Sequence, residues 1–315
     1  MNQIIGSNGT TAQENVTVKA GTTGDLNFVA NWESEGIQIQ GKLLSEQSYG
    51  VTTYQLYDTN NDNVADTALF QDQKLNLGAA TNTAGQIGAW KNGSTIENIV
   101  FDNCDIQSIS FAFDQINQLK TVTVNNCYKS NSDTGPILRF CNDINLQKII
   151  FSNMDSIATT MCFGNSSLQN VEYKNIGTLY DLSFKDASSL TYIDFSQCKR
   201  IAPSKLTQAF QGCTSLKTLD LSKFDLSRLN NSLALNNVFY NCTVLEELNL
   251  SGLEINYKFD VNDFSSLSSI KTIYCPAEWN CDKVDLPYTM KYYDGTKYIN
   301  VTKMDSSICN QILIK

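Results

Sequence analysis

The dominant pattern along the chain is a nine-residue template with apolar residues at its first, fourth, sixth and ninth positions. The stretch from Leu216 to Phe224 is its clearest copy, and polar residues fill most of the positions between. Eight copies occur, 22 to 29 residues apart, and they begin at Ile96, Leu119, Leu146, Leu168, Leu190, Leu216, Leu245 and Ile270. A recurrence at this period predicts a solenoid, in which every copy contributes one strand to a parallel sheet.

A second pattern precedes the strands, because an aromatic residue stands six positions ahead of most copies. These residues are Phe113, Phe140, Phe184, Phe210, Phe239 and Phe264, and Cys162 takes the place before Leu168. Another apolar residue often lies halfway, and a spacing of three keeps side chains on one face of a helical turn. We therefore predict an α/β repeat solenoid, with a parallel β-sheet of about eight strands on one face and irregular or short-helical arcs on the other.

The stretches 210–222 and 239–251 share the pattern F-x-x-C-x-x-L-x-x-L-x-L. This pattern closely resembles the BspA-like leucine-rich repeats, and the resemblance extends over residues 96–276. It implies a leucine-rich-repeat fold and a relation to bacterial and protist surface proteins, some of which bind host matrix or other bacteria. No catalytic residues belong to the family pattern, so the resemblance implies recognition without catalysis.

The segments outside the repeats are expected to form small β structures. Alternating apolar residues on either side of Gly21–Gly24 predict a hairpin in a partial β module at residues 1–33. Residues 10–33 of it resemble the end of a Listeria-Bacteroides repeat, a β module of bacterial surface proteins. Residues 34–95 are expected to form an N-terminal cap over the apolar end of the solenoid. After the solenoid at 96–276, residues 277–315 predict a C-terminal β cap with a turn at Asp294-Gly295.

Charge and composition exclude several functions. The chain carries 23 basic and 32 acidic residues and lacks a basic cluster that could neutralise a run of phosphates, so nucleic acid is not expected as a partner. No segment approaches about 18 consecutive apolar residues, so insertion into a membrane is not expected. The chain has no histidine, which excludes His-based triads and imidazole zinc sites. We predict that the protein is not an enzyme.

Most of the ten cysteines fall at positions that the repeat assigns to the core. Five of them hold either the ninth template position or the middle of the arc, namely Cys104, Cys127, Cys198, Cys213 and Cys242. We predict buried free thiols, because a buried thiol packs as a small hydrophobe. Cys275 and Cys281 could instead close a short disulfide loop in an oxidising compartment.

One polar loop offers oxygen ligands at calcium-loop spacing. Positions 1, 3, 5 and 9 of such a loop would be Asp58, Asn60, Asp62 and Asp66. Position 12 is Leu69, where a bidentate Glu is usual, so any calcium site here would be weak. The alternative is a solvated turn held by its own Asp and Asn side chains. No other cofactor is expected.

Strand positions between the core residues face the other way and form the candidate binding surface. Acidic, aromatic and small polar residues occupy it in the later repeats: Glu172, Tyr192, Asp194, Thr218, Asp220, Glu247, Asn249 and Tyr274. Because neighbouring strands lie about 4.8 Å apart, Glu172, Asp194 and Asp220 are expected in adjacent rungs, where they could bind a ligand or a cation. The alternative is that they only keep an exposed sheet soluble.

The leading interpretation is a recognition or adhesion protein, extracellular or at a bacterial surface, that binds a protein or glycan through this face. The alternative is a structural or receptor-binding protein of a bacteriophage, made in the cytoplasm, displayed on the virion and contacting other virion proteins. That alternative rests on the lack of a recognisable leader or anchor in the sequence and on core cysteines that look reduced.

Overall fold

The computed structural model describes residues 36–49, 51–77, 94–109, 112–229, 235–250, 252–253, 266–274, 284–293 and 298–304. The chain divides into two compact units, Met1–Gln38 and Ile39–Lys315, and every strand that the structure describes belongs to the second unit. The predicted N-terminal hairpin, Cys275 and Cys281 lie outside the described residues. No helix among the residues that the structure describes is long and apolar enough to span a membrane.

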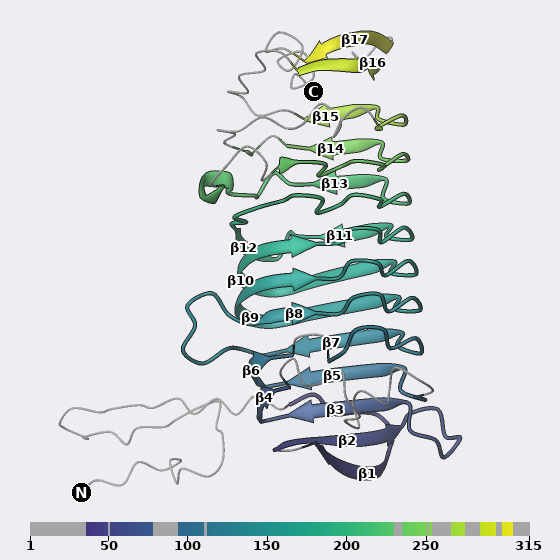
Figure 1. Cartoon of the computed structure of the whole chain (residues 1–315), viewed down its shortest axis with the longest axis vertical. Helices are drawn as coiled ribbons and strands as arrows, with labels where there is room; N and C mark the ends of the chain where they lie inside the picture. The colour runs from purple at the N-terminus through teal and green to yellow at the C-terminus, as the bar shows by residue number, and fades with distance from the viewer. Residues whose placement is uncertain are drawn as a thin grey trace, which may run out of the picture. The chain divides into compact units, whose positions relative to one another are not determined.

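The second unit is a β-solenoid whose first wall carries one parallel strand in each rung (Figure 1). The strands of this wall are β3 (Thr67–Gln71), β5 (Asn98–Asp102), β7 (Thr121–Asn125), the first parts of β9 (Lys148–Met161) and β10 (Asn170–Ser183), β11 (Tyr192–Asp194), β13 (Thr218–Asp220), β14 (Glu247–Asn249) and β15 (Thr272–Tyr274). All eight template copies supply such a strand, which confirms the predicted parallel sheet. β3 adds one more rung, which precedes the rung of the first template copy, the copy that begins at Ile96.

A second wall follows the corner at the end of most first-wall strands up to β11. It contains β4 (Lys74–Asn76), β6 (Asp105–Ser108), β8 (Ile137–Arg139), the later parts of β9 and β10, and β12 (Cys198–Ile201). β9 pairs with β10 along both walls, from Lys148↔Asn170 to Met161↔Ser183. The two walls therefore share one register, and a side chain in one rung lies directly over its equivalent in the next.

Asparagines turn the corner between the walls. Asn103, Asn126, Asn153 and Asn175 have φ between 50° and 55°, in the left-handed region that Asn tolerates better than most residues. Neighbouring rungs are linked there by side-chain hydrogen bonds, such as Asn126 Nδ2 to Asn103 Oδ1 at 3.1 Å and Asn175 Nδ2 to Asn153 Oδ1 at 3.0 Å. The polar corner residues are thus structural, since they hold the rungs in register.

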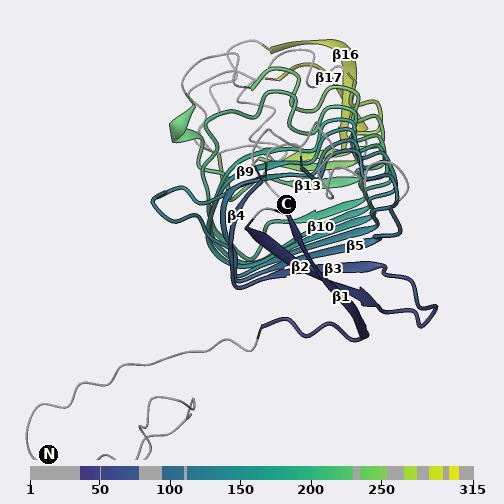
Figure 2. The ribbon, with the colours of Figure 1, turned by 60° about the horizontal axis from the view of Figure 1, so that its bottom comes forward.

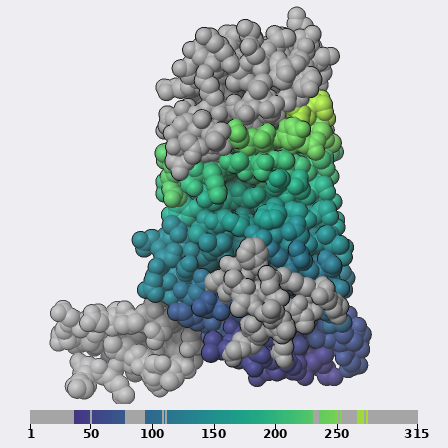
Figure 3. All heavy atoms as spheres, viewed as in Figure 1, coloured from purple at the N-terminus to yellow at the C-terminus, as the bar shows by residue number. Residues whose placement is uncertain are grey.

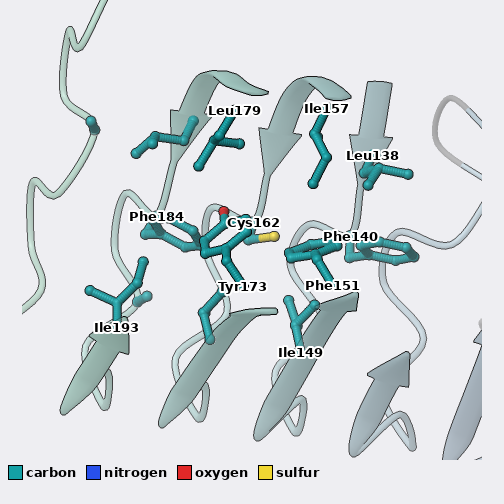
Figure 4. Close-up of a cluster of buried hydrophobic side chains, with 14 of the residues drawn as sticks. Leu138, Phe140, Ile149, Phe151, Ile157, Cys162, Tyr173, Leu179, Phe184 and Ile193 are labelled. Atoms are coloured by element: carbon teal, nitrogen blue, oxygen red, sulfur yellow. The ribbon is translucent and has the colours of Figure 1, made fainter. Parts of the chain in front are cut away.

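The core is a set of stacked columns of apolar side chains (Figure 4). Ile149 and Ile193 lie in one column, and Phe151, Tyr173 and Phe195 lie in the next, with ring centroids 5.1 Å and 5.6 Å apart. All of these side chains are buried. The apolar positions of the template within each strand are thus the inward-facing positions, and the polar positions between them face outward.

The predicted short-helical arcs are not confirmed. The described arcs are series of turns; in one of them Cys213 N donates to Phe210 O and Leu216 N donates to Cys213 O. Gly212, inside the first of these two turns, has φ +75°, a conformation that a helix cannot contain. The one helix described over its whole length is a single 3-10 turn, η2 (Leu226–Arg228), and no described residue lies in an α-helix, so the fold is better called a β-solenoid than an α/β one.

Antiparallel strands flank the parallel ones at the N-terminal end of the sheet. β1 (Lys42–Tyr49) pairs with β2 (Thr52–Asp58), and β2 pairs with β3, so this hairpin joins the first parallel strand directly (Figure 2). A second antiparallel pair, β16 (Val284–Tyr293) and β17 (Tyr298–Met304), lies in the predicted C-terminal cap. In Figure 3 the coloured atoms of the solenoid follow one another in chain order along the stack.

Candidate functional site

The outward positions of the first wall form two columns with the predicted register. Lys148, Asn170 and Tyr192 pair in turn in one column, and Ile150, Glu172 and Asp194 pair in the other. Further along, Thr218 pairs with Glu247 and Asp220 pairs with Asn249, which in turn pairs with Tyr274. The residues proposed from the sequence therefore share one face, and Tyr192 is 51% exposed on it.

The first wall is interrupted in the middle of this face. β11 ends a ten-stranded sheet, and β13 begins a separate three-stranded sheet. The second wall continues past this point, because Ile201 bridges Phe224 and the Asp225 N–H donates to Ile201 O at 2.7 Å. Glu172 and Asp194 therefore occupy adjacent hydrogen-bonded strands as predicted, whereas Asp194 and Asp220 lie on either side of a break in the sheet.

Glu172 is neutralised by two lysines. Lys148 Nζ lies 2.5 Å from one carboxylate oxygen and Lys174 Nζ lies 2.5 Å from the other. Hydrogen bonds from both ammonium groups lower the pKa of Glu172. Glu172 thus belongs to a local ion-pair cluster, and it does not extend an acidic strip toward Asp194.

Asp194 and Asp220 each hold the turn that follows their strand. Asp194 Oδ1 accepts a hydrogen bond from the Ser196 N–H at 2.7 Å, and Asp220 Oδ1 accepts one from the Ser222 N–H at 2.8 Å. The Asp-x-Ser pattern is a turn signature that was visible in the sequence. The second oxygen of the Asp220 carboxylate accepts no hydrogen bond from a described residue, and a test of binding at either position must preserve the turn.

Two tyrosines lie beside carboxylates on the same face. Tyr192 has its pKa raised by partial burial and by the charge of Asp194, to which its hydroxyl hydrogen-bonds. Tyr274 has its pKa raised by the charge of Glu247, with burial and a hydrogen bond to that carboxylate contributing further. Each pair presents an aromatic ring next to a negative charge, an arrangement suited to binding a cationic side chain.

The remaining members of the face are small and polar. Thr218 opens β13 and is exposed, while Asn249 closes β14 and is partly buried. They bring no ionisable group to the surface. The acidic strip consists of Asp194, Asp220 and Glu247, and none of these residues forms a salt bridge with another residue that the structure describes.

The polar loop at 58–66 is held together by its own side chains. Asp58 accepts hydrogen bonds from the N–H groups of Asn61, Asp62 and Asn63, at 2.7 to 3.3 Å. Asp66 accepts a bond from the Thr59 hydroxyl at 2.7 Å, Asn60 accepts one from the Asp62 N–H, and Asp62 accepts one from the Val64 N–H. Over the described ranges, no three His, Cys, Asp or Glu side chains gather into a metal-binding group. The calcium site stays a prediction, which thermal melting with and without calcium would test.

The cysteines at template positions are buried free thiols, as predicted from the repeat. Burial raises the pKa of Cys141 and of Cys198 to about 12, and neighbouring negative charges add to the shift. A thiol with such a pKa stays protonated near neutral pH, where only the thiolate is a good nucleophile or metal ligand. These cysteines therefore pack the core as small apolar side chains.

Stacked rungs with an exposed parallel sheet define a class of protein that presents an extended surface to its partner. Within that class, residues 136–247 and 206–281 match the family described as BspA type Leucine rich repeat region, in six copies. This part of the chain is therefore built from BspA-type leucine-rich repeats, which confirms the resemblance seen in its sequence. Neither a curated protein nor a solved structure matches the chain. Repeats of this type fit a role in protein binding or adhesion.

Proposed function

We propose that the protein is a non-catalytic adhesion module, displayed outside the cell or at a bacterial surface, that binds a protein partner through the first wall. The observation that carries this proposal is the acidic strip of Asp194, Asp220 and Glu247, none of which forms a salt bridge with a residue that the structure describes. Tyr192 and Tyr274 flank the strip. Its best partner is a protein surface that carries lysine or arginine.

The break between β11 and β13 supports the same location. Asp194 and Asp220 lie on either side of it, at the end of one sheet and the beginning of the next. Two carboxylates on separate sheets could each bind a cation of the partner, with about 1 kcal/mol or more from each charge-assisted hydrogen bond. No feature of the described residues favours the alternative role in a bacteriophage particle.

The double variant Asp194→Asn with Asp220→Asn tests the proposal. Asparagine keeps an oxygen for each turn and removes only the charge, so thermal stability should change little. Binding of the purified chain to immobilised extracellular matrix proteins and to bacterial cells should fall by at least tenfold, and the wild-type signal should weaken as salt is raised.

Asp133→Asn is the matched control, since Asp133 is an exposed carboxylate in the loop between β7 and β8. The control should bind as the wild type does. Equal binding by the double variant and the wild type would mean that the strip only keeps the sheet soluble.

A further inference from the structure

A pocket of about 290 Å³ lies where the antiparallel hairpin joins the solenoid, well away in sequence from the acidic strip. Its polar lining comes from β1, β2, the end of β3 and the turn that follows it, namely Glu46, Thr53, Gln55, Gln71, Asp72 and Gln73. This volume is at the small end of ligand sites, which span roughly 300–1,000 Å³. The pocket could therefore take one small ligand, or one residue of a chain.

The amide groups of the pocket are fixed in place. Gln73 Nε2 donates to Thr53 O at 2.7 Å, and the Thr53 N–H donates to Gln73 Oε1 at 2.9 Å. The side-chain amide of Gln73 thus pairs with both backbone groups of Thr53, as the backbone of a neighbouring strand would. Gln55 Nε2 donates to Glu46 Oε1 at 2.8 Å. Gln71 Nε2 donates to Asp102 Oδ2 at 2.9 Å. A wall that is already ordered loses little entropy when a ligand binds.

The oxygen atoms left over are hydrogen-bond acceptors. Asp72 uses one carboxylate oxygen to accept a bond from Asn103 Nδ2 at 2.7 Å. Among the described residues, the other oxygen of Asp72, the second oxygen of Glu46 and the Gln71 Oε1 atom have no hydrogen-bond partner. No lysine or arginine lines the pocket, so an anionic ligand would meet only repulsion. The ligand must be a donor of several hydrogen bonds.

Two apolar side chains close the inner end of the pocket. Tyr54 and Leu69 line it there, and because both are almost completely buried they add little apolar surface, so the wall is mainly polar. The Tyr54 ring packs on Phe70, with ring centroids 5.3 Å apart. Several acceptors around a mainly polar rim match the edge of a sugar ring, which carries several hydroxyl donors.

We propose that this pocket binds one neutral sugar residue, with the carboxylates of Glu46 and Asp72 accepting hydrogen bonds from its hydroxyl groups. The site is separate from the protein-binding face and does not depend on it. A single sugar held by a few hydrogen bonds over a small area should bind with a Kd in the millimolar range.

The test is a titration of the full-length, ¹⁵N-labelled protein with the methyl glycosides of glucose, galactose, mannose and N-acetylglucosamine. At least one of them should shift the side-chain amide signals of Gln55, Gln71 and Gln73 in a saturable manner. Glu46→Gln and Asp72→Asn should each weaken that binding at least tenfold, because each replaces a charged acceptor with a neutral one. Asn at position 72 tolerates the φ of +54° found there and can still accept the bond from Asn103.

Asp133→Asn and Asp194→Asn serve as controls and should bind the glycoside as the wild type does, which separates this site from the acidic strip. The proposal is overturned if none of the four glycosides shifts the three amide signals, or if both pocket variants bind as tightly as the wild type. It is also overturned if Nα-acetyl-lysine methyl ester binds to the pocket and the glycosides do not. The site would then be one for an ammonium group.

Discussion

Tyr173 is the one tyrosine in a column whose other described members are phenylalanine or an aliphatic residue, and its hydroxyl is buried without a hydrogen bond. The buried Thr160 hydroxyl comes close enough to favour ionisation of the phenol slightly, but it too lacks a hydrogen bond. Burial outweighs that contact and raises the pKa of Tyr173 well above its ordinary value. The hydroxyl is thus a polar group that has lost water and gained no partner.

Replacing Tyr173 by Phe removes this hydroxyl and keeps the stacked ring, which lies 5.1 Å from Phe151 and 5.6 Å from Phe195. An unsatisfied buried polar group costs about 1–3 kcal/mol, and the oxygen atom that is lost takes some packing contacts with it. We therefore expect the free energy of unfolding to rise by about 1 kcal/mol. For a chain of this length, that corresponds to an increase in Tm of about 2 °C.

The assay is thermal unfolding followed by circular dichroism, with urea unfolding as a second measurement. Tyr192→Phe is the matched control, because Tyr192 is 51% exposed on the same wall and its replacement should change stability by less than about 0.5 kcal/mol. A loss of 1 kcal/mol or more in Tyr173→Phe would refute the reasoning, since the hydroxyl would then have a partner in solution. Combining the change with Thr160→Val would show whether that partner is Thr160.

Three further predictions concern the stack. Arg139→Met leaves the nearly buried Asp114 without its ion pair at 2.7 Å and should lower the unfolding free energy by about 3 kcal/mol, as urea unfolding would show; a loss under 1 kcal/mol contradicts this. Gly177→Ala places a Cβ 2.2 Å from Asp155 O in the neighbouring rung and should lower the unfolding free energy by about 1–3 kcal/mol in the same assay. Ala158→Gly is the control, because it adds no atom that would push the rungs apart. Hydrogen bonds from Ser227 and Arg200 lower the pKa of Asp225 from 3.8 to about 2, so its stabilisation is complete above pH 3.8 and disappears as pH falls through about 2. The difference in Tm between the wild type and Asp225→Asn should therefore shrink below pH 4, and a constant difference would disprove the assignment.

The strands and core columns were predictable because a strand repeats every two residues and its inward positions must be apolar in every rung. Leu216, Leu219 and Leu221 are all buried, as the template requires. The arcs were predicted less well, since the spacing of three in Phe210, Cys213 and Leu216 fits a helical turn and a series of β-turns equally. The left-handed φ of Gly212 decides between them, and glycine alone does not reveal its φ.

The candidate face was predictable in its membership but not in its electrostatics. Lys174 follows Glu172 by two residues and so faces the same way. A comparison of equivalent positions in different strands does not reveal such a neighbour within one strand. The break between β11 and β13 leaves no mark in the spacing of the template copies. The pocket at Gln73 was not predictable either, because it depends on a side chain that hydrogen-bonds to the backbone of another strand.

The central claim is that the first wall is the binding surface, and hydrogen–deuterium exchange on the partner-bound protein tests it most directly. With a partner found in the binding panel, the account predicts slower exchange in β11, β13 and β14, on both sides of the break that separates Asp194 from Asp220. It also predicts unchanged exchange in β8 and β12 of the second wall. Protection confined to β8 and β12, with the first wall unchanged, would contradict the account.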